Sequence, residues 1–331
     1  MKAAPFVLPM LIWSGSGAIA QAPIIDMHLH AQSAEAQGPP GQTICAPYVD
    51  WPARDPGEPI ERYFEAFSGR PDCPRHFKAA VTDKEIRDRT LAELERLNVI
   101  AVTSGDPDMV ELWRKQAPTR IVPAISGALP TIAELRRLHT AGRLKVLGEM
   151  GAQSHGKGPD DPKLAPYYAL AEELDIPVAV HLGPSAPGVA YFGAPQFRAG
   201  AGDPLLLEDV LVRHPKLRLY VMHAAYPLAD RMIALMHAHP QVYVDIGAIS
   251  FVVPKPEFHR YLRRLVEAGF AKRVMFGSDQ MIWPETIAVA IEHVESADFL
   301  TAAQKRDIFY NNAARFLRLD EATIARHQGS R

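Results

Sequence analysis

The sequence lacks an excess of charge of either sign. Its 36 basic side chains nearly balance 38 acidic ones, for a formal net charge of −2, and no long run of charged residues occurs. This balance gives no electrostatic reason to expect nucleic acid or an anionic membrane as a partner. Because 47% of the residues are apolar, we expect an ordinary globular core.

The sequence also lacks an apolar run near its start that is long enough to span a bilayer. The run from Phe6 to Trp13 is too short for a spanning helix. It follows the positive charge of Lys2 and precedes a small-x-small pattern at residues 18–20. A buried N-terminal helix is the alternative, but this order favours a signal peptide over residues 1–20. We therefore expect an exported protein, periplasmic or secreted, whose mature chain has no membrane span.

Cysteine is scarce, with only Cys45 and Cys73 in the whole chain. Both lie in an irregular segment, residues 31–81, that is rich in proline, glycine and alanine. In a cytosolic protein they would be buried thiols, whereas two cysteines in an exported protein indicate a single disulfide. A long segment of this kind is usually a functional lid or a linker. Its aromatic residues favour packing, so we expect a long insertion over the active-site face, with a short helix near residues 59–67.

No glycine-rich dinucleotide fingerprint follows an early strand, which counts against an open doubly wound sheet. Short apolar runs, typical of strands buried on both faces, instead alternate with helical patterns. The predicted strands are residues 24–30, 99–104, 121–125, 146–151, 178–182, 217–223, 242–246 and 274–276. The predicted helices are residues 82–97, 106–116, 131–140, 161–174, 203–213, 227–238, 256–268, 284–294, 301–310 and 312–317. Eight such units predict an α/β fold, a (β/α)₈ TIM barrel that forms one domain over residues 21–331.

Two histidines separated by one residue end the first predicted strand. Side chains in a strand repeat with a period of 2, so His28 and His30 should share one side, with Met27 and Leu29 on the other. Two imidazoles placed in this way are half of a transition-metal site, although a chance pair of surface histidines is the alternative. We expect Asp26, in the same strand, to support the site or to be a core polar residue rather than a ligand.

Four other predicted strands also end in residues of metal-ligand types. The candidate ligands are then His28, His30, Glu149, His181, His223 and Asp279. Each has an ordinary explanation when taken alone, such as a salt bridge for Glu149 or a helix cap for Asp279. A TIM barrel, however, gathers the C-terminal ends of its strands at one face, where so many unpaired buried polar groups would be costly. The sequence therefore predicts a metal centre there.

The same residues resemble the amidohydrolase superfamily, which has the order His-x-His, Glu, His, His, Asp on strands one, four, five, six and eight. Residues 208–217 (EDVLVRHPKL), 276–279 (FGSD) and 310–314 (YNNAA) are similar to its amidohydrolase-2 branch. The resemblance implies a metal held by His28, His30 and Asp279, with His181 and His223 binding it or working beside it. Glu149, in place of a carbamylated lysine, is similar to the bridging group of binuclear members. Many members of the branch resemble mononuclear enzymes, so the resemblance is compatible with a site that holds either one or two metal ions.

A metal-dependent hydrolase that uses activated water on an amide, lactone or other ester bond of a small molecule is our leading interpretation. Asp279 would take the proton from the water and pass it to the leaving group. Histidine-rich ligation favours Zn²⁺, and the carboxylates also suit Mn²⁺. A non-oxidative decarboxylase or hydratase is the second interpretation, with His223 as the general acid or base. A metal-binding protein without turnover is the third.

We expect substrate choice to reside in the loops after the first and fifth predicted strands, because loops above a barrel carry specificity. The second of these loops, residues 183–202, contains Tyr191 and Arg198 among small residues. Arg198 is the candidate for binding a substrate carboxylate, since its planar guanidinium matches that group. A solvated surface charge is the alternative for Arg198. The sequence is also compatible with assembly of the protein into a homo-oligomer.

Overall fold

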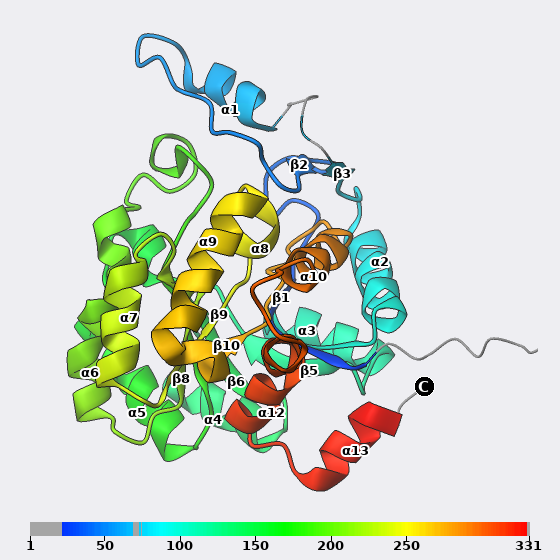
Figure 1. Cartoon of the computed structure of the whole chain (residues 1–331), viewed down its shortest axis with the longest axis vertical. Coiled ribbons are helices and arrows are strands. Elements are labelled where there is room, and N and C mark those ends of the chain that lie inside the picture. The colour runs from blue at the N-terminus through cyan, green and yellow to red at the C-terminus, as the bar shows by residue number, and fades with distance from the viewer. Residues whose placement is uncertain (1–21, 69–72, 74, 330–331) are drawn as a thin grey trace, which may run out of the picture.

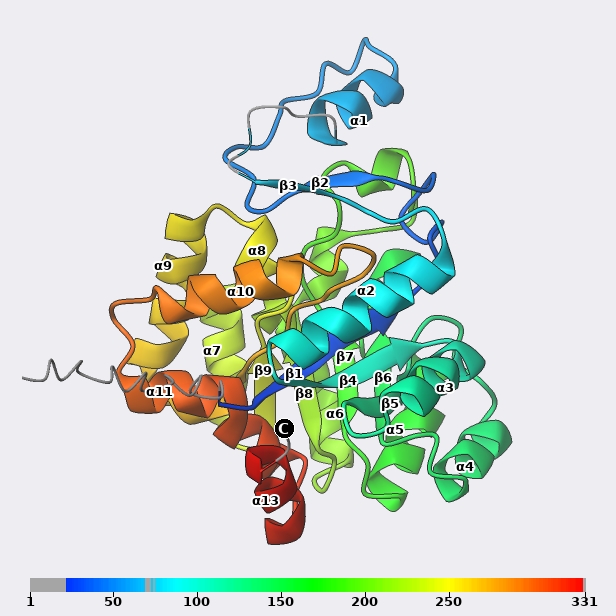
Figure 2. The ribbon, with the colours of Figure 1, turned by 90° about the vertical axis from the view of Figure 1, so that its right-hand side faces the viewer.

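The computed structural model describes residues 22–68, 73 and 75–329. The predicted signal peptide, residues 1–20, lies outside the described residues. Eight parallel strands form one sheet in the order β1, β4, β5, β6, β7, β8, β9 and β10 (Figures 1 and 2). Their bounds are Ile24–Ala31, Val99–Gly105, Ile121–Ile125, Val146–Met150, Val178–His181, Leu219–Met222, Val242–Asp245 and Val274–Met275.

The first and last strands meet through the residues that follow β10. The amide of Met27 donates to the carbonyl of Phe276 at 2.9 Å, and that of His30 donates to the carbonyl of Gln280 at 2.9 Å. Leu29 and Gln280 also form a parallel bridge. The sheet is therefore a nearly closed barrel, which confirms the predicted TIM barrel.

Helices flank the strands, and several begin at the predicted caps. Thr82 accepts a hydrogen bond from the amide of Glu85, and Asp106 caps a helix that has Pro107 in its first turn. The helices after β1 to β6 are α2 (Asp83–Arg96), α3 (Pro107–Gln116), α4 (Ile132–Thr140) and α5 (Ala165–Glu173). The later ones are α6 (Glu208–Arg213), α7 (Ala229–Ala238), α8 (Ile249–Val252), α9 (Lys255–Leu265), α10 (Thr286–Glu295), α11 (Ala302–Arg306), α12 (Asn312–Phe316) and α13 (Glu321–Gly329).

The barrel interior is filled by one buried cluster to which most strands contribute. Its members include Ile25, Met27, Val102, Ala124, Val146, Ala179, Tyr220 and Met275. Leu29 belongs instead to the larger cluster that includes the helices. The prediction that Met27 and Leu29 share a side is therefore wrong. The reason is a slip in the pairing of β1 with β4 between Asp26 and Leu29, which breaks the period of 2.

The segment after β1 folds over the face toward which the strands run. It contains β2 (Thr43–Cys45), which pairs antiparallel with β3 (His76–Lys78), and α1 (Ile60–Ser68). A disulfide joins Cys45 to Cys73, whose Cα atoms lie 5.8 Å apart. The amide of Tyr48 donates to the carbonyl of Val252, which follows β9. Figures 1 and 2 show α1, β2 and β3 together at one end of the barrel.

Two predicted boundaries, one in the sixth barrel strand and one in the helix before it, needed correction. The predicted strand 217–223 is shorter, because β8 ends at Met222 and the chain then turns through three residues with positive φ. The predicted helix 203–213 begins as a 3₁₀ turn at Pro204–Leu207, since Pro204 follows the Asp203 cap, and becomes α6 only at Glu208. The first correction places His223 in a turn rather than in the strand.

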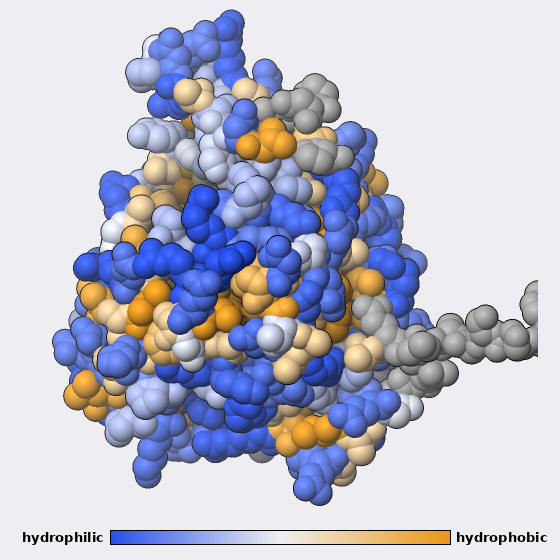
Figure 3. Space-filling view, viewed as in Figure 1, coloured by the Kyte–Doolittle hydropathy of each residue, from blue (hydrophilic) through white to orange (hydrophobic). Residues whose placement is uncertain are grey.

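No helix in the described part of the chain has both the length and the apolar character needed to cross a membrane. Hydrophilic residues cover most of the face shown in Figure 3, with apolar residues scattered among them.

Candidate metal centre

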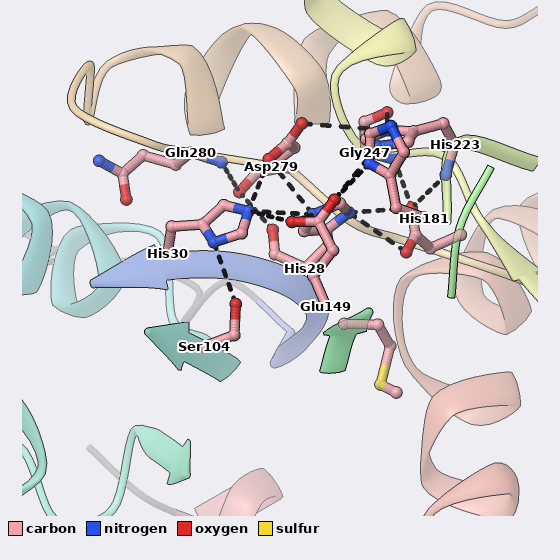
Figure 4. A network of polar contacts seen from close by, with 12 residues as sticks. His28, His30, Ser104, Glu149, His181, His223, Gly247, Asp279 and Gln280 are labelled. Atoms are coloured by element: carbon pink, nitrogen blue, oxygen red, sulfur yellow. Dashed lines mark hydrogen bonds and ion pairs between the residues drawn. The ribbon is translucent and has the colours of Figure 1, made fainter. Parts of the chain in front are cut away.

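His28 and His30 project from β1 with their Nε2 atoms 3.2 Å apart (Figure 4). The other ring nitrogen of each has its own partner. Nδ1 of His30 lies 3.0 Å from the hydroxyl of Ser104, and Nδ1 of His28 lies 3.3 Å from the carboxylate of Asp245. Partners of this kind fix the ring orientation and leave Nε2 for a ligand. Both imidazoles are therefore presented as the sequence predicts.

Two carboxylates face these Nε2 atoms. Oδ1 of Asp279 lies 3.2 Å from Nε2 of His28 and 3.0 Å from Nε2 of His30. Oε2 of Glu149 lies 3.2 Å from Nε2 of His30 and 3.9 Å from Nε2 of His28. We call His28, His30, Asp279 and this Glu149 oxygen the first donor group. Nitrogen and carboxylate oxygen donors in this number suit a transition-metal ion.

The other oxygen of Glu149 belongs to a second set of donors. Oε1 contacts Nδ1 of His181 and lies 3.9 Å from Nε2 of His223. The two ring nitrogens are 3.1 Å apart. Nδ1 of His223 lies 2.9 Å from the carbonyl of Gly247, so the bond to that acceptor leaves Nε2 unprotonated in the neutral ring. We call Glu149 Oε1, His181 and His223 the second donor group.

A glycine places Glu149 between the two groups. Gly148 has φ of +139°, and a Cβ there would collide with the carbonyl oxygen of Ala179 on β7. Only glycine adopts this backbone at such close approach without strain. The strand can therefore bring the Glu149 carboxylate to the centre of the barrel mouth.

The charges of the site compensate one another. Burial opposes a charge on His30, but hydrogen bonds and charges from Asp279 and Glu149 outweigh it and raise its pKa to about 9. The pKa of His28 is raised well above its ordinary value, because Asp279 and Asp245 outweigh burial. Burial likewise opposes the ionised form of Glu149, but the charge of His181 and hydrogen bonds from its imidazole neighbours hold the pKa of Glu149 well below its usual range. Protonated imidazoles thus balance ionised carboxylates, and a divalent cation would take the place of those protons.

The structure brings all six predicted ligand residues together but keeps the two predicted substrate residues apart from them. Arg198 is exposed, and its guanidinium donates to the carbonyls of Pro195 and Phe197 in its own loop. Tyr191 is 65% exposed, and the guanidinium of Arg54 lies 4.8 Å from its ring centre. Both bonds come from Nη1, so they occupy only part of the guanidinium, and binding of a substrate carboxylate by Arg198 stays a prediction.

Two residues that support the site were not among the sequence predictions. Ser104 and Asp245 are both buried and contact the imidazoles of His30 and His28. Asp245 is the last residue of β9 and follows an apolar run, the same signal that identified Glu149 and Asp279. That signal was available in the sequence for Asp245. Ser104 gave no comparable signal, because serine is common at strand ends.

Comparisons with known proteins agree with this geometry. The amidohydrolase family model matches residues 25–319. Protein fluG from Emericella nidulans is 23% identical in an alignment of 150 residues that covers 38% of this chain and 17% of that protein. The chain thus spans under a fifth of the length of that curated relative.

Solved structures share the fold. A probable 2-pyrone-4,6-dicarboxylic acid hydrolase from Acinetobacter baumannii has a TM-score of 0.55 at 13% identity, over 89% of this chain and 99% of that chain. The 5-carboxyvanillate decarboxylase from Sphingomonas paucimobilis has a TM-score of 0.57 at 16% identity, over 91% and 100%. Members of the matched family use divalent metals, and His28, His30 and Asp279 are residues that could bind one. With its barrel and this cluster inside the matched region, the chain belongs to the amidohydrolase family.

Proposed function

We propose that the protein is a metal-dependent hydrolase that acts on an amide, lactone or other ester bond of a small molecule. The single observation that carries the proposal is the position of Glu149. One of its oxygens faces His30 at 3.2 Å, while the other contacts His181. A carboxylate whose two oxygens face separate sets of imidazoles is suited to bridge two ions, the arrangement used by two-metal hydrolases.

The two donor groups would each hold one ion, with Zn²⁺ favoured by the imidazoles and Mn²⁺ also compatible. Bound divalent ions in such a site polarise a carbonyl oxygen and lower the pKa of a water molecule toward neutrality. Asp279 would accept the proton of the attacking water and return it to the leaving group. The backbone of Asp279 is fixed for this role, because its amide donates to the carbonyl of His28 at 2.6 Å.

A lyase, either a decarboxylase or a hydratase, is the second candidate. The 5-carboxyvanillate decarboxylase with the same fold supports it. In this version a single ion occupies the first donor group, and His223 is left to move a proton. Nε2 of His223 faces Nδ1 of His181 at 3.1 Å and could exchange a proton with it. The number of bound ions therefore separates the two candidates.

The test is the metal content of the wild-type protein and of Glu149→Gln after loading with Zn²⁺ or Mn²⁺. We expect two ions per wild-type chain and one per variant chain, because the amide cannot bridge as a carboxylate does. Glu172→Gln is the matched control, since Glu172 also pairs with a histidine, His214 at 3.0 Å, outside the site. It should bind two ions. One tightly held ion in all three proteins would reject the two-ion model and favour the lyase.

Activity is tested separately on panels of small amides, lactones and carboxylic acids, with and without a chelator. Hydrolysis that is lost with the chelator and restored by Zn²⁺ supports the proposal. Bound metal with no turnover on any panel would favour a binding protein. We expect the choice of substrate to depend on the segments after β1 and β7, which meet where Phe64 and Phe192 pack edge to face with ring centres 5.3 Å apart.

A further inference from the structure

Asp245 contacts two of the candidate ligands, His28 and His223, and is completely buried. It ends β9, the barrel strand between β8 and β10, which His223 and Asp279 respectively follow. A buried carboxylate without partners would be unstable, so its contacts indicate its role. Those contacts reach one residue of each donor group.

The first contact is with the imidazole of His28. Both carboxylate oxygens are close to Nδ1, at 3.3 Å for Oδ2 and 3.4 Å for Oδ1. An ionised carboxylate only accepts hydrogen bonds, so this contact holds the proton of His28 on Nδ1. In the neutral imidazole that a metal ion requires, the lone pair is then on Nε2, which lies 3.2 Å from Oδ1 of Asp279 in the first donor group.

The second contact is with the backbone of His223. Oδ1 of Asp245 accepts the amide of His223 at 3.2 Å and that of Gly247 at 2.8 Å. His223 begins a turn of three residues other than glycine with φ of 55°, 49° and 54°. Such backbone persists only where its surroundings hold it. The Gly247 carbonyl in turn accepts from Nδ1 of His223, so both the backbone and the ring of this second-group ligand depend on the same carboxylate.

Close packing holds Asp245 and His28 together. A Cβ on Gly247 would lie 2.6 Å from Nδ1 of His28. A Cβ on Gly277 would lie 2.9 Å from the Cβ of His28 and 3.2 Å from Cγ of Asp245. Because Gly247 and Gly277 have no side chains, His28 and Asp245 can pack against each other at these distances.

We propose that Asp245 is a positioning residue that prepares both donor groups, by fixing the His28 tautomer and by anchoring the turn that carries His223. The inference rests on the proposed metal site. In this role Asp245 contacts neither the substrate nor a reacting atom. Its consequence is that one buried carboxylate links the two metal positions.

The test compares two substitutions that remove different contacts. Asp245→Asn keeps an oxygen for the two amides but can donate to Nδ1 of His28, which moves the imidazole proton to Nε2. It should weaken Zn²⁺ binding at the first donor group by about 10–100-fold, the range for partners of metal-bound histidines. Asp245→Ala also loses the anchor of His223, so both metal positions should weaken. Competition with a chromophoric chelator and the absorption of bound Co²⁺ measure these affinities without an activity assay.

Asp307→Asn is the matched control. Asp307 is also buried, but its carboxylate accepts from Lys272 at 2.5 Å and from Asn311 at 3.0 Å, neither of which is a candidate ligand. We expect its Zn²⁺ affinity to stay within about threefold of the wild-type value, well short of the change for a lost histidine partner. Equal affinities in wild-type protein and Asp245→Asn, or equal losses in Asp245→Asn and the control, would overturn the inference.

If the Asp245 variants do not fold, nitrogen NMR of histidine in the wild-type zinc protein gives the answer. A proton on Nδ1 of His28 with Nε2 bound to metal supports the inference, and the reverse tautomer overturns it. Wild-type protein that binds no Zn²⁺, Mn²⁺ or Co²⁺ would overturn the proposed function and this inference with it. Metal affinity that is unchanged by the Asp245 substitutions would overturn only the inference.

Discussion

His30 contacts two carboxylates, and this contact makes the metal-free site sensitive to pH. Its pKa of about 9 lies above the value of 6.5 for an unperturbed histidine, since Asp279 and Glu149 outweigh burial. His30 is therefore protonated in the metal-free protein at neutral pH. A metal ion binds only the neutral imidazole, so binding must release that proton.

We predict that the apparent Zn²⁺ affinity rises as the pH increases from 6.5 toward 9. In the metal-free protein the sign is opposite, because a raised pKa in the folded state stabilises the fold below pH 6.5 and the effect is lost as the pH rises through about 9. Chelator competition and denaturant unfolding of metal-free protein across this range check both trends. Zn²⁺ affinity that does not change with pH would show that His30 is already neutral.

At the scale of single elements, β6 depends on the glycine before Glu149. A Cβ at Gly148 would meet the Ala179 carbonyl, and its φ of +139° disfavours any other residue. We predict that Gly148→Ala destabilises the fold by about 1–3 kcal/mol, the usual cost of strained backbone. It should also lower the bound metal to one ion or fewer, because Glu149 shifts with its strand.

Gly151→Ala is the control for this substitution. Gly151 lies three residues further along the same segment, and a Cβ there would have no atom within 4 Å. Denaturant unfolding and metal analysis should find it close to wild type. Equal effects of the two substitutions would mean that close packing at Gly148 has no special role.

The strand ends explain how much of this architecture could be predicted. Apolar runs followed by Glu149, His181 and Asp279 identified both the strands and the face where the ligands meet, because both are properties of local sequence. The turn at His223 could not be predicted, since nothing in His-Ala-Ala-Tyr favours positive φ. Tertiary contacts with Asp245 and Gly247 hold it. The slip in β1 likewise depends on pairing with a neighbouring strand.

At the scale of the whole molecule, the segment between β1 and α2 contacts the barrel through hydrogen bonds, an ion pair and buried side chains that join the main core. The indole of Trp283 donates to the carbonyl of Gln42 at 2.8 Å, the amide of Tyr48 donates to the carbonyl of Val252 at 3.0 Å, and Arg75 pairs with Glu292 at 2.8 Å. The disulfide between Cys45 and Cys73 closes the part of this segment that contains α1.

We predict that the protein isolated after export begins near residue 21 and contains no free thiol, because the sequence at its start favours a signal peptide. The disulfide closes a loop with a sequence separation of 28 residues, so replacing both cysteines by alanine should cost about 3–4 kcal/mol by the loop-entropy relation. The loss should appear first as faster proteolysis between residues 46 and 72, while metal content stays at the wild-type level because all six candidate ligands lie outside this loop. Mass spectrometry without reductant, limited proteolysis and metal analysis measure the three effects. Two free thiols in the exported protein, or an intact Met1, would contradict the prediction, and loss of metal in the double variant would mean that the segment and the metal centre fold as one unit.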